Sequence, residues 1–164
     1  MQLNVFRTLW GVTTPWQQTV SELRSVGCCG IEARVPLTPE EQRALAQRIE
    51  ASALEYIAIV FSGGGVIPAQ AETPAQHLER LKERFAAAKA LNPRFVNLLA
   101  GNDRWPLAQQ VDFLGRAHEL AAEYELFCSF ETHRATSLYS PWLTLEIIQQ
   151  LPQLRFTADI SHWI

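Results

Sequence analysis

Two stretches near the end of the sequence decide the fold: LFCSFETHR at residues 126–134 and LRFTADISHW at residues 154–163. Each begins with an apolar run too short for a helix, which predicts buried strands at 126–130 and 154–158. A helical pattern at 141–151 separates them. This order predicts two parallel strands whose C-terminal ends meet at one edge of a sheet, where α/β enzymes hold their catalytic residues.

The same alternation of strand and helix runs through the whole chain. Apolar runs predict further strands at residues 3–9, 30–35, 54–61 and 95–100, and amphipathic patterns predict the helices between them, including one at 106–125. Four helices are predicted to begin at a Thr-Pro or Ser-Pro pair, with the capping residues Thr14, Thr38, Thr73 and Ser140. Strict alternation requires a parallel sheet with right-handed crossovers.

Two architectures fit this alternation, an open doubly wound sheet and a (β/α)₈ barrel of the TIM type. No helix follows the sixth predicted strand, so that strand would expose apolar surface and unpaired backbone groups in an open sheet. This favours a TIM barrel interrupted after its sixth strand. We therefore expect residues 1–164 to form a single, partial barrel domain with about six βα units.

Composition excludes several classes of protein. The formal net charge is −3, with 14 basic and 17 acidic residues, so there is no basic surplus for nucleic-acid binding. No apolar run approaches the ~20 residues of a membrane-spanning helix. The three cysteines include the adjacent pair Cys28 and Cys29, which predicts reduced thiols and a cytoplasmic location. A homo-oligomer is compatible with these features.

The two strand ends carry the candidate chemistry. Glu131 and Asp159 lie 28 residues apart at matching positions of successive strands, so their carboxylates can share one cation. His133 and His162 follow them closely. Two carboxylates with one or two imidazoles suit a divalent metal such as Mn²⁺, Co²⁺, Mg²⁺ or Zn²⁺. Taken singly, each carboxylate could be an ion-pair partner or a helix cap, His133 an exposed loop residue, and Trp163 either apolar cover or a sugar-stacking ring.

A glycine run, Gly63-Gly64-Gly65, follows the third predicted strand. Such a run can hold a phosphate when it leads straight into a helix. Here no helix begins directly after it, and the Lys-Ser/Thr pair of a phosphate-binding loop is missing. The run therefore predicts a flexible loop over the site, and it disfavours a doubly wound nucleotide-binding fold.

Three motifs together resemble the xylose isomerase-like TIM-barrel superfamily, which includes sugar isomerases and epimerases and endonuclease IV. They are Gly30-Ile31-Glu32, Glu131-Thr132-His133-Arg134 and Asp159-Ile160-Ser161-His162-Trp163. The resemblance implies that Glu131 and Asp159 are metal ligands, that Glu131 also acts as the acid/base, and that His162 contacts the substrate or helps to bind the metal. It also implies two further ligands, a His and a Glu, from a seventh and an eighth strand that this sequence does not contain.

The activity implied by the resemblance is isomerisation or epimerisation of a small sugar or hydroxy-carbonyl substrate by proton transfer through an enediolate. Glu131 would move the proton, with His162 as its catalytic partner, while the metal polarises the substrate carbonyl. His133, Arg134, His162, Trp163 and Glu32 would bind the substrate, with Arg134 and His162 facing its oxygens.

Two alternatives remain. The endonuclease IV branch needs histidines on its second and third strands, and residues 30–35 and 54–61 contain none, which disfavours DNA repair. The other is a truncated barrel without catalytic activity, or a remnant that serves only as a binding module. Metal titration would separate this possibility from an isomerase.

Overall fold

The computed structural model describes residues 3–164, with α-helices alternating with strands along the chain. The strands are β1 (Phe6–Thr8), β2 (Gly30–Arg34), β3 (Glu55–Phe61), β4 (Phe95–Leu99), β5 (Cys128–Glu131) and β6 (Phe156–Thr157). The helices are α1 (Trp16–Ser25), α2 (Pro39–Ser52), α3 (Pro74–Ala90), α4 (Leu107–Glu123) and α5 (Pro141–Gln150), and a 3₁₀ turn covers Ile160–His162. No helix within residues 3–164 is long and apolar enough to cross a membrane.

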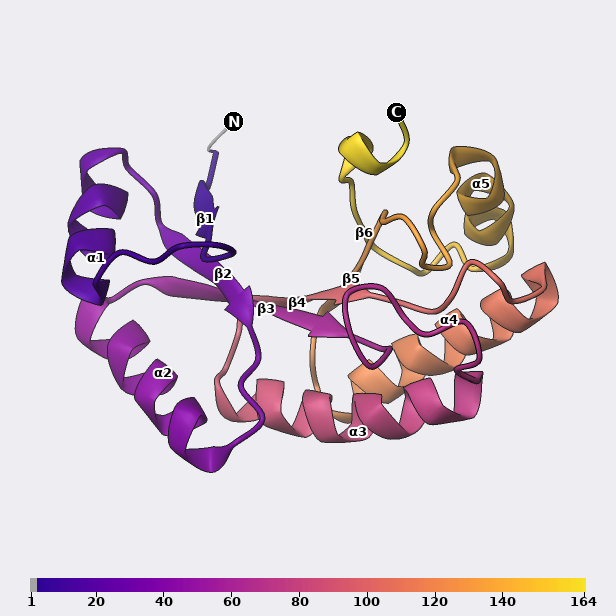
Figure 1. The fold of residues 1–164 in the computed structure, drawn as a ribbon, viewed down its shortest axis with the longest axis horizontal. Helices are drawn as coiled ribbons and strands as arrows, with labels where there is room; N and C mark the ends of the chain where they lie inside the picture. The colour runs from indigo at the N-terminus through magenta and orange to yellow at the C-terminus, as the bar shows by residue number, and fades with distance from the viewer. Residues whose placement is uncertain (1–2) are drawn as a thin grey trace.

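The strands form one parallel sheet in the order β1-β2-β3-β4-β5-β6. The helices follow one side of this sheet, and β1 and β6 lie at its two edges with the ends of the described chain beside them (Figure 1). This is a half-barrel, which confirms the predicted partial TIM barrel. A doubly wound sheet would reverse its strand order at a switch point, and this sheet does not.

Two of the four predicted helix caps form as expected. The Thr38 hydroxyl accepts a hydrogen bond from the Glu41 backbone N–H, and Thr73 and Gln76 form a complete capping box. The prediction for Thr14 was wrong, because α1 begins after Pro15 and the Thr14 hydroxyl bonds instead to that of Thr19 at 2.9 Å. Ser140 stands at the start of α5 but makes no capping bond through its side chain.

The two edge strands are shorter than predicted. β1 covers only Phe6–Thr8 within the predicted range 3–9. β6 covers only Phe156–Thr157, because the Leu154 backbone N–H closes a turn onto the Leu151 carbonyl at 3.2 Å. An apolar residue in a tight turn therefore gave the same sequence signal as a strand residue.

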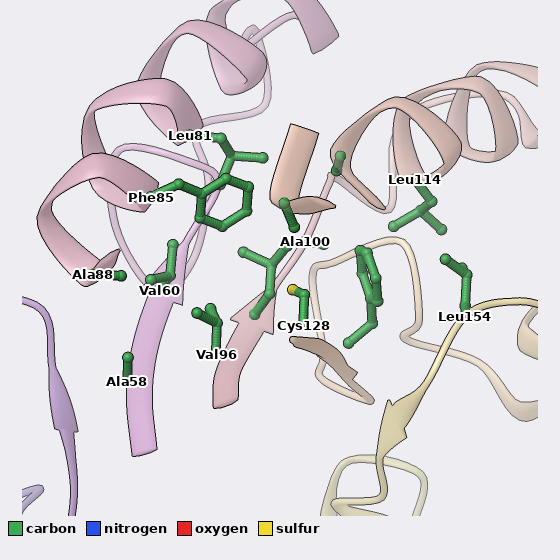
Figure 2. Packing of buried hydrophobic residues seen from close by; sticks show 14 of the residues in the cluster. Ala58, Val60, Leu81, Phe85, Ala88, Val96, Ala100, Leu114, Cys128 and Leu154 are labelled. Atoms are coloured by element: carbon green, nitrogen blue, oxygen red, sulfur yellow. The ribbon is translucent and has the colours of Figure 1, made fainter. Parts of the chain in front are cut away.

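The main core lies between the sheet and the helices. In β3, β4 and β5 every second residue, including Ala58, Val60, Val96 and Cys128, belongs to this core. Figure 2 shows Val60 and Val96 on the side of the sheet that faces Phe85 of α3. Phe85, Phe113 and Phe130 are fully buried in this layer. The intervening residues point to the inner face of the half-barrel, where β3 and β4 contribute a small apolar cluster of Ile59, Phe61 and Leu99.

The loop between β3 and α3 is fixed by a buried polar chain. The Ser62 hydroxyl accepts from the Gly101 backbone N–H at 2.8 Å and lies 2.9 Å from His77 Nδ1. His77 Nε2 lies 3.0 Å from Glu72, whose carboxylate accepts from the Gly64 backbone N–H. Burial lowers the pKa of His77 to about 4, so this ring is neutral at physiological pH. The glycine run thus belongs to an anchored loop.

Candidate active site

Two inward-facing carboxylates are joined by one amide at the C-terminal edge of the sheet. Glu32 comes from β2, Asn97 from β4 and Glu131 from the last position of β5. Asn97 Nδ2 donates to Glu32 Oε1 at 3.0 Å and to Glu131 Oε2 at 2.6 Å. Asn97 is only 3% exposed, so this bridge lies out of water and fixes the two carboxylates relative to each other.

The environment of Glu131 raises its pKa to about 7. Burial is the largest cause, and the negative charges of Glu32 and Asp159 act in the same direction. The hydrogen bond from Asn97 opposes them, because it stabilises the ionised form. A carboxyl with this pKa can both accept and return a proton near neutral pH.

The two histidines lie against each other beside Glu131. The ring centroids of His133 and His162 are 3.9 Å apart, and one ligand atom from each, together with one from Glu131, fall within 4.8 Å of one another. The structure therefore brings together Glu131, His133 and His162 from the predicted set. Burial lowers the pKa of His133, which keeps its imidazole neutral and able to donate a lone pair.

Hydrogen bonds give the two imidazoles different tautomers. His133 Nδ1 lies 2.6 Å from the Arg134 carbonyl, which can only accept, so Nδ1 carries the proton and Nε2 is free to bind a cation. His162 Nδ1 accepts from Arg134 Nε at 2.9 Å, so Nε2 of the neutral ring carries the proton. In these tautomers His133 can bind a metal ion through Nε2, whereas His162 can donate a hydrogen bond from Nε2.

Asp159 lines the same pocket but stands outside this group of three. Its Oδ1 accepts from the Ser161 backbone N–H at 3.0 Å and from the Ser161 hydroxyl at 2.6 Å. These bonds are the main reason why the pKa of Asp159 is lowered, so the carboxylate is ionised. Its second oxygen, Oδ2, lies 3.5 Å from His162 Nε2 and is the oxygen that faces the site.

Trp163 follows His162 in the chain but is not among the residues that line the pocket. Its indole Nε1 donates to the Leu138 carbonyl at 3.1 Å, which holds the ring against the loop after β5. Arg134 does not line the pocket; its guanidinium bonds to His162 and its backbone carbonyl to His133. Of the residues predicted to bind substrate, Glu32, His133 and His162 line the pocket.

The pocket has a volume of about 400 Å³, and two kinds of side chain line it. Trp10, Ile59, Phe61, Val66 and Leu99 form an apolar wall, and Thr8, Glu32, Glu131, His133, Asp159 and His162 form a polar one. An apolar wall with a few converging polar groups is typical of small-molecule sites. Sequence reasoning missed Trp10 and the bridging Asn97, although a single Asn within the apolar run FVNLL was a usable signal.

The donor set fits a divalent cation. Glu131 offers a carboxylate oxygen and His133 a neutral ring nitrogen, and Oδ2 of Asp159 faces the same pocket. Mixed oxygen and nitrogen ligands suit Zn²⁺, Mn²⁺ and Co²⁺. His162 could join them only if Arg134 released its Nδ1, because the neutral ring otherwise presents an N–H to the pocket.

Several solved structures share this fold. D-allulose 3-epimerase from Methylomonas sp., solved with D-allulose, matches 98% of the chain at 15% identity, with a TM-score of 0.72. The probable 3-DHS dehydratase AsbF from Bacillus anthracis also matches 98% at 15% identity, with a TM-score of 0.69. The IOLI protein with a binding zinc atom matches 92% at 12% identity, with a TM-score of 0.67.

The chain spans less than two thirds of the length of these structures, covering 64% of the first two and 59% of the third. A search of curated protein sequences found no match. The model of one protein family, described as the xylose isomerase-like TIM barrel, matches residues 20–164. With its parallel half-barrel and its carboxylates at the strand ends, this chain belongs to the xylose isomerase-like TIM barrel family.

Proposed function

We propose that this chain carries the proton-transfer site of a metal-dependent sugar isomerase or epimerase that acts on a small sugar or hydroxy-carbonyl compound. The observation that carries the proposal is Glu131, whose pKa is raised to about 7 in a pocket that it shares with two histidines. Solved structures of D-allulose, D-psicose and L-ribulose 3-epimerases, which have the same fold, support this class of substrate.

Glu131 is the group that moves the proton. Its carboxylate takes a proton from the carbon next to the substrate carbonyl, and the electron pair moves to the carbonyl oxygen to give an enediolate. Returning the proton to the neighbouring carbon completes isomerisation, whereas epimerisation needs a second carboxyl group on the opposite face of the substrate to deliver a proton there. The bond from Asn97 holds one carboxylate oxygen and leaves Oε1 to face the substrate.

His162 assists by hydrogen bonding. Because Arg134 donates to Nδ1, the Nε2–H of His162 is available to a substrate oxygen on which negative charge develops. Glu32, held by the same amide as Glu131, accepts a hydrogen bond from a substrate hydroxyl. Trp163 remains a proposed apolar flank for the sugar, from its place next to His162 in the chain.

The cation would be held by Glu131, His133 and Asp159 among the residues of this chain. When bound, a divalent ion such as Mn²⁺, Co²⁺, Mg²⁺ or Zn²⁺ supplies Lewis-acid polarisation of the substrate carbonyl. His133 Nε2 is free for this role because Nδ1 bonds to a backbone carbonyl. We expect Asp159→Asn and His133→Ala each to weaken Mn²⁺ binding, as measured by calorimetric titration without any substrate.

Hydrogen exchange with solvent tests the proposal directly. Ketoses of five and six carbons, incubated with the protein and Mn²⁺ in D₂O, should incorporate deuterium next to the carbonyl, as followed by proton NMR. Glu131→Gln should abolish this exchange, whereas Glu119→Gln, at an exposed position of α4, should leave it unchanged. No exchange with any ketose, or exchange that survives in Glu131→Gln, would contradict the proposal. Sugar binding without exchange would favour a non-catalytic binding module instead.

A further inference from the structure

Arg34, the last residue of β2, lies beside the pocket, in an adjoining hollow that Trp10 and Ile59 also line. Its guanidinium lies between two aromatic rings, with Cζ 4.6 Å from the centroid of Trp10 and 4.6 Å from that of Phe61. Both rings also line the candidate active site. The positive charge of Arg34 is therefore held at the rim of the pocket in which Glu131 lies.

The edge of this guanidinium has no partner within residues 3–164. The Arg34 side chain makes no hydrogen bond and no ion pair there, whereas Arg7, Arg80 and Arg94 each pair with a glutamate. Aromatic rings on its two faces stabilise the cation and restrict its rotation, yet they use none of its N–H groups. A stacked guanidinium with free N–H donors is suited to bind an oxyanion through two parallel hydrogen bonds.

The surroundings of Arg34 add positive charge. Arg84 lines the same small hollow as Arg34, together with Gly64 and Gly65. Arg84 donates to the backbone carbonyls of Phe61 and Gly63, so its hydrogen bonds go to neutral acceptors. Burial lowers the pKa of Arg84 most, and the positive charges of Arg80 and, less strongly, Arg34 act in the same direction. An anion placed here would relieve the repulsion between the two guanidinium groups.

The position of Arg34 limits the size of the substrate. Arg34 and Glu32 are two residues apart on β2 and point to the same inner face, so their Cα atoms are separated by about 6.6 Å. Glu32 is joined through Asn97 to Glu131. A molecule of a few carbons can therefore place one end at Arg34 and its carbonyl near Glu131.

We propose that the substrate of this site carries a terminal oxyanion, a phosphate or a carboxylate, which Arg34 binds between Trp10 and Phe61. This inference rests on the proposed function and specifies its substrate class as a phosphorylated or acidic sugar. Arg34 determines specificity and orientation here, and it takes no part in moving the proton.

The test compares binding, measured by calorimetry, with and without the charge. A ketopentose 5-phosphate should bind the unmodified protein at least about tenfold more tightly than the uncharged ketopentose, since a bidentate charge-assisted contact typically contributes this much or more. Arg34→Met should remove the difference, and Arg34→Lys should keep only part of it, because lysine retains the charge without the planar fork. Arg43→Met is the matched control, on exposed α2 surface and without hydrogen bonds or ion pairs in the described chain.

Sugar acids of the same length provide a second arm. Preference for the phosphate or for the carboxylate would identify the oxyanion, and both results support the proposal. Equal binding of charged and neutral sugars, or undiminished phosphate binding by Arg34→Met, would overturn it. Repeating the titration with Glu131→Gln separates this proposal from the proposed function. Anion binding by Arg34 should persist in that variant, and it should be seen in the unmodified protein even if that protein transfers no proton.

Discussion

Replacing Asn97 by leucine should raise the pKa of Glu131 further. Leucine has the same branched arrangement of side-chain heavy atoms as asparagine but cannot donate the 2.6 Å hydrogen bond that stabilises the ionised carboxylate. A hydrogen bond to a charged group contributes about 1.5–3 kcal/mol, and each pKa unit corresponds to about 1.4 kcal/mol. Because Glu131 is partly exposed, the lower end applies, and we expect its pKa to rise from about 7 by roughly one unit.

Carbon-13 NMR of the glutamate side-chain carboxyls, recorded against pH, measures this shift. The Glu131 resonance is assigned as the one lost in Glu131→Gln. Gln109→Leu, at an exposed position of α4, serves as the matched control and should leave the titration unchanged. If the pKa of Glu131 stays constant or falls in Asn97→Leu, the amide does not stabilise the ionised form and our account of this site is wrong.

Three further outcomes follow from the same contacts. Since Glu131 binds its proton more tightly in the folded state than in the unfolded state, folding stability should fall as pH rises from about 4.5 to about 7. Glu131→Gln should remove about 1–2 kcal/mol of this fall, after allowance for solvent screening, as measured by urea unfolding across that pH range. Parallel plots of unfolding free energy against pH for the variant and the unmodified protein would show that Glu131 does not cause the fall. Phe85→Ala should cost about 3–5 kcal/mol in urea unfolding, because a fully buried ring is lost; a cost below about 1 kcal/mol would mean that the layer repacks. Ser62→Ala should destabilise the fold by about 1–3 kcal/mol, since His77 and the Gly101 N–H lose a buried partner, and thermal melts that coincide with the unmodified protein would argue against this chain of contacts.

The sequence predicted the positions of the strands and helices well because their patterns are local. Glu131 and His162 could be placed at one edge because parallel strands always bring their C-terminal ends together. The bridge made by Asn97 was missed, since it depends on a contact between strands that are not neighbours in the sheet. The tautomers of His133 and His162 were equally beyond reach, because they are set by loop contacts with Arg134. Periodicity carries no information about such contacts.

The bridge also makes the acidity of Glu131 depend on the curvature of the sheet. Two other strands lie between β2 and β5, so in a flat sheet the backbones that carry Glu32 and Glu131 would be roughly 14 Å apart. A single amide nitrogen reaches both carboxylates only because the strands roll inward and their side chains converge. Unrolling the sheet would separate the two negative charges, admit water and return Glu131 to the acidity of an ordinary surface glutamate. The curvature of the sheet is therefore itself one cause of the raised pKa of Glu131.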